Sequence, residues 1–185
     1  MVRRYEISLS PEAVLQAAFR LLDEEGLEAL TMRRLASSLS VQAPALYWHV
    51  RDKAELVHRM ASRIYADARS AVPAAADWRG WLIGFGHALR HTLLAHRDAA
   101  RLCATARGGE ASDAATRTRA IAAPLVALGL DEDKALIFQA SVISLTLGWS
   151  SYQEGPMHEP LRELMDFDRA FDVGLTALVR GYEGP

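Results

Sequence analysis

The stretch LTMRRLASSLSVQAPALYWHVRDKAEL, residues 30–56, combines two short helical patterns with a sharp break between them. Thr31 can cap a first helix whose apolar residues recur at helical spacing. A break follows at Ser40, and a second short helix is expected over residues 42–49. Asp52 can then cap a long helix. Two short helices joined by a tight link form a helix-turn-helix motif, so the stretch predicts a helical fold organised around this motif.

The two short helices need a shared core, because helices of about two turns are not stable by themselves. A helix expected over residues 11–25, with Ser10 as N-cap and Gly26 as C-cap, can contribute to it, as can the long helix. Six apolar residues are placed to face this core: Leu35, Ala36, Leu39, Leu46, Val50 and Leu56. With Leu46 and Val50 pointing inward, the leading end of the second short helix must face outward.

In a helix-turn-helix motif, that leading end enters the DNA major groove. Gln42 can contact an adenine edge with two hydrogen bonds, and Pro44 or Ala45 can touch a thymine methyl group. Polar side chains around them can contact phosphates. Trp48 has two interpretations, as part of the groove-facing wall or as packing against the first helix. The predicted DNA-binding residues are Thr31, Arg33, Gln42, Ala43, Pro44, Ala45, Tyr47, Trp48, His49 and Lys53.

Composition restricts the alternatives. The chain has 185 residues, a formal net charge of −2 and 50% hydrophobic residues, enough for a sizeable core. Four basic residues against one acidic residue over 29–53 make the charge locally positive, which matters more for phosphate contact than the total does. The N-terminus lacks the apolar segment of a secretory signal, and no apolar run reaches about 18 residues. A single cysteine, Cys103, fits a reducing compartment, so we expect a cytoplasmic protein without a membrane span.

Almost no segment has the alternating pattern of a β-strand, so the fold class is predicted to be all-α. Pro124 should kink or split the helix in which it lies. The last helix begins near Pro160 or near Asp166. Beyond the helix-turn-helix motif, helices are expected over residues 53–72, 78–95, 98–106, 111–128, 131–153 and from 160 or 166 to 182.

The quoted stretch closely resembles the DNA-binding motif of the TetR family of bacterial transcriptional regulators. The resemblance covers residues 11–70 well and extends less closely into WRGWL and LLAHRDAARL. Ser40 stands where the family usually has glycine, and a left-handed serine there would cost on the order of 1 kcal/mol. The resemblance implies a DNA-binding domain over residues 1–53, a connecting helix over 54–72 and an effector-binding and dimerisation domain over 73–185.

It further implies a homodimer in which the last two long helices of each subunit form a four-helix bundle. Any single residue of their apolar stripes can equally well belong to the core of its own chain. The stripes consist of Leu136, Ala140, Ile143, Leu147, Phe171, Leu175 and Leu178.

The effector pocket that the resemblance implies lies in the C-terminal domain. Each candidate can instead be a core residue, and Arg107 can be a solvated loop residue. The candidates are Trp81, Phe85, Leu89, Cys103, Arg107, Phe138, Trp149 and Tyr152. Cys103 and Tyr152 occupy positions where the tetracycline-binding members have groups that bind or surround magnesium. Magnesium prefers oxygen ligands to a thiol, so we expect a small apolar or aromatic effector with one polar or anionic group.

The expected function is that of a ligand-responsive DNA-binding regulator, a repressor released from a palindromic operator by its effector. An activator of the same fold and a helical interaction adaptor with weak DNA affinity remain alternatives. No nucleophile, phosphate-loop or metalloprotease motif supports an enzyme, although Cys103 with a distant histidine is a remote possibility. His87 and His91 have the spacing of metal ligands, but no further ligand follows them, so neither a metal site nor a cofactor is expected.

Overall fold

Helices make up all the regular secondary structure in the part of the chain that the structure describes. The computed structural model describes residues 9–106 and 111–182, with the side chains of all but 111–117. The elements are α1 Pro11–Glu25, the 3-10 helix η1 Leu27–Ala29, α2 Met32–Ser38, α3 Ala43–Leu46, α4 Lys53–Ser70, α5 Trp78–Leu94, α6 Ala99–Thr105, α7 Ala111–Ala127, α8 Glu132–Glu154, α9 His158–Arg162 and α10 Phe167–Gly181. The predicted all-α class is confirmed.

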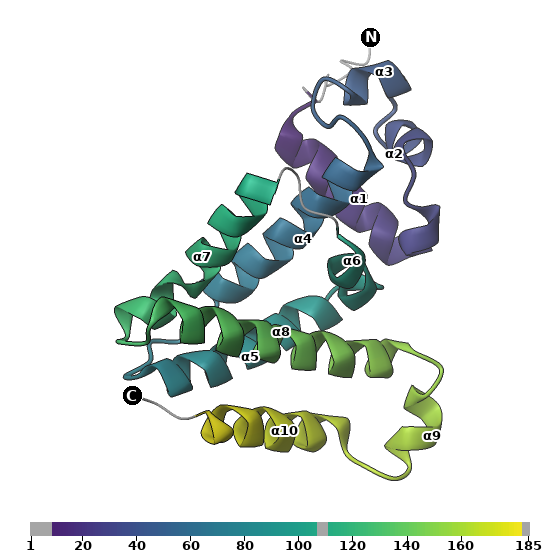
Figure 1. Cartoon of the computed structure of the whole chain (residues 1–185). Coiled ribbons are helices and arrows are strands. Elements are labelled where there is room, and N and C mark those ends of the chain that lie inside the picture. The colour runs from purple at the N-terminus through teal and green to yellow at the C-terminus, as the bar shows by residue number, and fades with distance from the viewer. Residues whose placement is uncertain (1–8, 107–110, 183–185) are drawn as a thin grey trace.

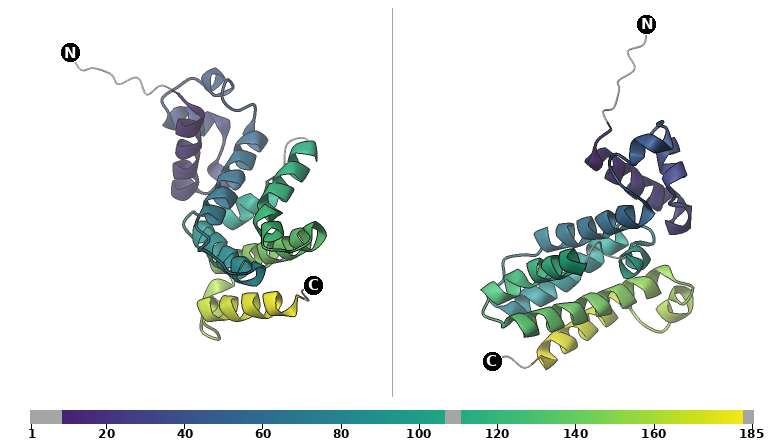
Figure 2. Two further views of the ribbon diagram at one scale, coloured as in Figure 1. Left: turned by 90° about the vertical axis from the view of Figure 1, so that its left-hand side faces the viewer. Right: turned by 45° about the horizontal axis from the view of Figure 1, so that its top comes forward.

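Three parts can be followed in Figure 1, and we name them by their elements. The head consists of α1, η1, α2 and α3, and the body consists of α5 to α10. Helix α4 starts beside the head and runs into the body, where it packs against α5 and α6. In the body, α8 packs against α5, α6, α7 and α10, and Figure 2 shows α8 and α10 side by side at the end of the molecule far from the head.

Side-chain caps begin most of these helices where the sequence predicts. Ser10 accepts a hydrogen bond from the Ala13 N–H at 3.1 Å, and Asp77 accepts one from the Gly80 N–H at 2.8 Å. Such caps satisfy backbone donors that the first turn of a helix leaves free. At the last long helix, Asp166 is the cap, so the helix begins at Asp166 and not near Pro160.

Pro124 does not split its helix, and the prediction of a split is wrong. Proline lacks the N–H that would bond to the carbonyl of Ala120. Pro124 lies in the last turn of α7, and Ala120 is exposed, so this carbonyl lies where solvent can reach it. The helix therefore continues without interruption to Ala127.

A continuous apolar core joins the head to the body through α4. Within the body, α5 and α10 approach closely at Gly86, where a Cβ atom would lie 2.7 Å from Leu175 Cδ2. Phe171 and Leu175 are fully buried in their own chain, so of the two interpretations of these residues the structure supports the core and not the dimer stripe. Among the exposed apolar residues on these helices are instead Ile137 on α8 and Val173 on α10.

Ala140 of the predicted stripe is exposed, while Leu136, Ile143, Leu147 and Leu178 are half-buried. Within the described residues, no helix is long and apolar enough to cross a membrane.

Candidate DNA interface and effector pocket

The link between α2 and α3 is a tight helix-ending turn. The Val41 N–H donates to the Ala36 carbonyl at 3.0 Å, and the Ser40 N–H donates to the Ser37 carbonyl at 3.0 Å. These two bonds form a Schellman motif, which requires a left-handed residue at its C′ position. Ser40 is that residue, with φ 55°. The left-handed serine predicted from the sequence is therefore present, and this turn sets the angle at which α3 leaves α2.

Helix α3 is shorter than the predicted helix over residues 42–49. It covers only Ala43–Leu46, and residues 47–49 form a turn. The N–H groups of His49 and Val50 both donate to the Leu46 carbonyl, at 2.8 and 2.9 Å. This turn lets Leu46 and Val50 both reach the core, where they are 0% and 2% exposed.

The outward side of α3 is a surface of polar and aromatic side chains. Gln42 and Pro44 are exposed, Ala43 and Ala45 are half-buried, and Tyr47 is 52% exposed. Trp48 is 89% exposed, so it does not pack against α1. A fully solvated indole is costly because of its large apolar area. Of the two interpretations of Trp48, the structure leaves the outward-facing one.

Two cations border this surface. Arg33 on α2 and Lys53 on α4 are exposed, and neither has a salt-bridge partner among the described residues. Arg51, in contrast, pairs with Glu55, whose carboxylate also accepts the Arg51 backbone N–H at 2.7 Å. The backbone hydrogen bond is the main reason why the pKa of Glu55 lies below its usual value. Arg33 and Lys53 are therefore the two cations left available for phosphates.

Two further predicted residues lie at helix starts or in turns beside this surface. Thr31 is exposed and caps α2, with its Oγ1 accepting the Arg34 N–H at 3.2 Å. His49 is half-buried at the end of the turn after α3. All ten predicted DNA-binding residues thus lie on α2, α3, the turn after it and the start of α4.

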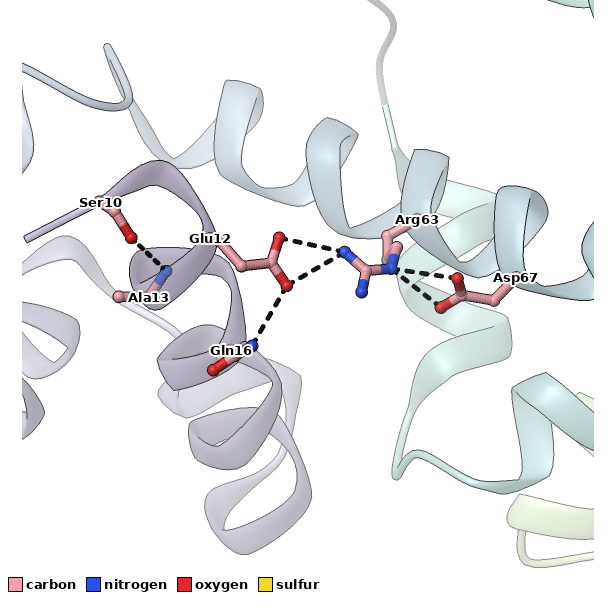
Figure 3. Close-up of polar contacts among 6 residues, drawn as sticks. All are labelled: Ser10, Glu12, Ala13, Gln16, Arg63 and Asp67. Carbon is pink, nitrogen blue, oxygen red and sulfur yellow. Dashed lines mark hydrogen bonds and ion pairs between the residues drawn. The ribbon is translucent and has the colours of Figure 1, made fainter.

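An arginine on α4 clamps the head to the connecting helix (Figure 3). Arg63 Nη1 donates to Glu12 Oε2 on α1 at 3.2 Å, and its Nε donates to Asp67 Oδ1 at 3.0 Å. The hydrogen bond from Arg63 lowers the pKa of Glu12. Glu12 lies in the first turn of α1, so the clamp ties the N-terminal end of α1, and with it the head, to α4.

A second connection joins the corner between α5 and α6 to the head. Asp23 on α1 accepts hydrogen bonds from the Arg97 N–H at 3.2 Å and faces His96 Nδ1 at 3.0 Å. Asp98 accepts the Leu27 N–H at 2.8 Å. The body therefore contacts the head both through α4 and through the start of α6.

A cavity of about 430 Å³ lies between α4, α6 and α7. Its lining consists of His58, Ala61, Ser62, Tyr65, Ala66, Arg69, Cys103, Ala106, Thr118, Ala120 and Ile121. The six residues from α4 recur at intervals of three or four, so they form one face of that helix. This volume lies within the usual range for a small-molecule site.

Two of the lining residues form a hydrogen-bonded pair, the Tyr65 hydroxyl and the Cys103 thiol. Burial raises the pKa of Cys103 to about 12, and burial likewise raises the pKa of Tyr65. A thiolate is the reactive form of cysteine, so Cys103 remains an unreactive thiol near neutral pH. This environment argues against the idea that Cys103 is a nucleophile.

Of the eight predicted effector-binding residues, only Cys103 lines this cavity among those described. Trp81, Phe85, Leu89 and Phe138 are buried in the body core, and Trp81 stacks on Phe85 with ring centroids 5.1 Å apart. Trp149 packs edge-on against Phe167 of α10, and Tyr152 is 54% exposed. Arg107 lies outside the described residues.

The sequence-based prediction missed the α4 side of the cavity. Ser62, Tyr65 and Arg69 lie on α4 opposite its apolar core face. Their spacing of three and four residues places them on one face of α4, but α4 also has a solvent-exposed polar face, so the spacing alone does not distinguish a cavity wall from a solvated surface. The contribution of α6 and α7 had no signal either, since it depends on how these helices pack.

No group of three or more potential metal ligands comes together in the described part of the chain. The two histidines with metal-ligand spacing both line a shallow hollow beside Arg90, and His87 Nε2 lies 3.3 Å from Asp172 Oδ1 on α10.

Comparisons with known proteins show which proteins this chain resembles. The family model of bacterial regulatory proteins, tetR family, matches residues 14–60. The chain is 34% identical to the tetracycline repressor protein class A from transposon 1721 of Escherichia coli, over 94% of this chain and 90% of that protein. It is 30% identical to the class D repressor of the same organism, over 95% and 89% of the two chains.

Two solved structures are similar over nearly the whole chain. One is a variant of TetR from Acinetobacter baumannii AYE in complex with minocycline, with 33% identity, a TM-score of 0.75 and coverage of 94% and 92%. The other is a possible TetR family transcriptional regulator from Streptomyces coelicolor A3(2), with 30% identity, a TM-score of 0.76 and coverage of 93% and 98%.

Proposed function

Because the chain belongs to the tetR family of bacterial regulatory proteins, we propose that it is a cytoplasmic repressor that leaves its operator when a small molecule binds the α4–α6–α7 cavity. The observation that carries the proposal is the surface formed by α3 and the turn after it. Its apolar residues Leu46 and Val50 are buried, Gln42 at its leading end is exposed, and the exposed cations Arg33 and Lys53 have no salt-bridge partner in the part of the chain that the structure describes. This distribution suits DNA and leaves little else for the exposed residues to do.

In this proposal the leading end of α3 lies in the major groove. Gln42 contacts a base edge, Pro44 and Ala45 approach thymine methyl groups, and Ala43 allows the close approach. Tyr47, Trp48 and His49 lie along the groove wall. Thr31, Arg33 and Lys53 contact phosphates and fix the register of the head on the duplex.

The operator is proposed to be palindromic, because two heads in a homodimer bind half-sites about one helical turn, roughly 34 Å, apart. Exposed Ile137 on α8 and Val173 on α10 support dimerisation through these two helices. Isolated apolar residues are common on surfaces, but these two lie on neighbouring helices at one end of the body (Figure 2).

The proposed control is a shift between two populations that differ in the position of α4. Helix α4 provides six residues of the cavity and also holds Arg63, which clamps the head through Glu12. A ligand that binds one position of α4 more tightly shifts the population toward it, in proportion to that difference in affinity. The spacing between the heads changes, and operator affinity falls.

The test begins with selection of DNA sites from a random pool by the purified full chain, followed by titration of the selected duplex. We expect a palindrome that is bound at least a thousand-fold more tightly than unrelated DNA. Gln42→Ala should weaken discrimination at one base pair of each half-site by about 1–3 kcal/mol. Lys53→Ala should instead weaken binding to all sequences and reduce the salt dependence by about one ion.

Ser151→Ala is the control, since Ser151 is an exposed polar residue of α8 in the body, away from the surface of α3. A protein that binds all duplexes equally, with no site enriched by selection, would contradict the proposal and favour an interaction adaptor. A reporter gene behind the selected site separates repression from activation, with higher expression on deletion of the regulator expected for a repressor.

A further inference from the structure

The cavity between α4, α6 and α7 contains a cation that no other described residue neutralises. Arg69 lies in the last turn of α4 and is half-buried, and no salt bridge or side-chain hydrogen bond joins it to another described residue. Arg63, on the same helix, is engaged on both sides by Glu12 and Asp67. Arg63 therefore has a structural role, whereas the charge of Arg69 is available to bind a ligand.

We propose that the effector is a small organic anion, bound without a metal ion, whose acidic group pairs with Arg69 and whose ring lies between Cys103 and Ile121. This inference rests on the proposed function, because it names the class of ligand for the cavity assigned there.

The charge of the lining supports an anion. No carboxylate occurs among the described lining residues, while Arg69 provides a planar set of N–H donors. Arginine and carboxylate form paired, charge-assisted hydrogen bonds that gain strength as water is excluded. A magnesium chelate would meet a thiol, an imidazole and hydroxyl groups in place of the anionic oxygen ligands that magnesium prefers.

The shape of the cavity supports a ring attached to that acidic group. His58 and Arg69 are eleven residues apart on α4, which corresponds to a length of roughly 16 Å along the helix. The rest of the lining consists of four alanines, the Tyr65–Cys103 pair, Ile121 and the two hydroxyl residues Ser62 and Thr118. Small walls leave room for a flat apolar body, and the Tyr65 hydroxyl can bond to a carbonyl or hydroxyl group on it.

Arg69 also has a purely structural explanation, because a cation in the last turn of a helix interacts favourably with the helix dipole. The two roles give different results. Loss of a helix-dipole interaction lowers protein stability equally with and without ligand. Loss of an anchor for the anion lowers the affinity for an anionic ligand and leaves the affinity for an uncharged analogue of that ligand unchanged.

The experiment uses benzoate, 1-naphthoate and anthracene-9-carboxylate, each paired with its neutral primary amide, and measures Kd by calorimetry in EDTA. The proteins are the full chain, Arg69→Gln, Arg69→Lys and Arg20→Gln, an exposed arginine on α1 that serves as control. At least one carboxylate should bind the unaltered protein ten-fold or more tightly than its amide. Arg69→Gln should remove that preference, Arg69→Lys should restore part of it, and Arg20→Gln should leave it unchanged.

Three outcomes would overturn the proposal: failure of all three carboxylates to bind, equal affinity of acid and amide, or a preference that survives Arg69→Gln. Binding of a tetracycline that requires added Mg²⁺, with no binding of the carboxylates, would overturn it as well. Operator titration of the same preparations separates the two proposals. A protein that selects a palindrome but ignores carboxylates refutes the anion anchor alone, and one that binds carboxylates but selects no DNA site refutes the proposed repressor alone.

Discussion

The head and the body differ in what they bury. All the buried side chains described in α1, η1, α2 and α3 are apolar, and the polar side chains of the head are exposed or half-buried on α1 and α2 and at the residues that flank α3, such as Gln42 and Tyr47. The body buries Gln139, Thr146 and Ser150 on α8, and it encloses part of a cavity of about 430 Å³. A closed apolar core holds one conformation, while a core with polar groups and a cavity can adjust around a ligand. The head suits a fixed contact surface, and the body suits a sensor.

The protection of Cys103 tests whether the body is closed around its cavity in the absence of ligand. With the pKa raised from 9.0 to about 12, its thiolate population at pH 8 falls by a factor of about a thousand. We expect iodoacetamide to react with the native protein about a thousand-fold more slowly than with the urea-unfolded protein, as followed by mass spectrometry. A native rate within ten-fold of the unfolded rate would mean that the cavity opens readily. The body would then differ from the closed core of the head even more than the structure suggests.

The next largest effect is expected from Leu46→Ala, which removes the only buried side chain of α3. Truncation of a fully buried leucine costs about 2–5 kcal/mol. Because α3 has a single turn and no other anchor, operator affinity should fall by more than a hundred-fold, while affinity for a cavity ligand changes by less than two-fold. Chemical denaturation and operator titration measure the two effects.

Leu82→Ala is the matched control, since Leu82 is a fully buried leucine of α5 in the body. It should cost a similar amount of stability and leave the selected DNA sequence unchanged. If Leu82→Ala changed operator specificity as much as Leu46→Ala does, a packing defect in the body would disturb DNA recognition as strongly as one in the head. That result would contradict the proposed division of roles between the head and the body.

The same contrast explains what could be predicted from the sequence. The caps Ser10, Thr31 and Asp52 act on backbone groups within three residues, so local sequence determines the starts of α1, α2 and α4. The left-handed Ser40 was implied by the resemblance, because this serine stands where the TetR family usually has glycine. The predicted DNA-binding residues therefore lie together on one surface.

The cavity depends on distances that local patterns do not contain. Cys103 meets Tyr65 only because α6 packs against α4, and the two residues are far apart in sequence. The predicted aromatic candidates, such as Trp81 and Phe85, proved to be core residues, because periodicity marks a buried face but does not say whether it faces a cavity or another helix. Phe171 and Leu175 were assigned to a dimer stripe for the same reason.

Ser40→Gly probes how firmly the turn holds the head. A left-handed serine costs on the order of 1 kcal/mol, but glycine loses more chain entropy on folding, so the net gain in stability should be less than about 1 kcal/mol. We expect a slightly higher Tm and an unchanged operator sequence. The control Ser38→Gly, in the last turn of helical α2, should lower the Tm instead. A loss of stability in Ser40→Gly would mean that the strain is offset by contacts of the serine side chain.

The smallest effect concerns the clamp between the two parts, and its pH dependence identifies it. Arg63 holds the pKa of Glu12 below the ordinary value of 4.5, so the folded state favours the carboxylate. The clamp therefore stabilises the protein above pH 4.5, and its contribution disappears as the pH falls through the lowered pKa of Glu12. Glu12 is fully exposed, so solvent screening keeps the effect small, and Arg63 retains Asp67 in Glu12→Gln.

Denaturation curves of the original protein and Glu12→Gln should therefore differ slightly at pH 7, and the difference should shrink as the pH falls from 4.5 toward 3. Glu24→Gln, an exposed glutamate of α1 without an ion pair among the described residues, should show no such difference at either pH. A difference for Glu12→Gln that persisted unchanged at pH 3 would show that the carboxylate acts through packing and not through charge. The head would then be joined to α4 by the apolar core and the α5–α6 corner alone.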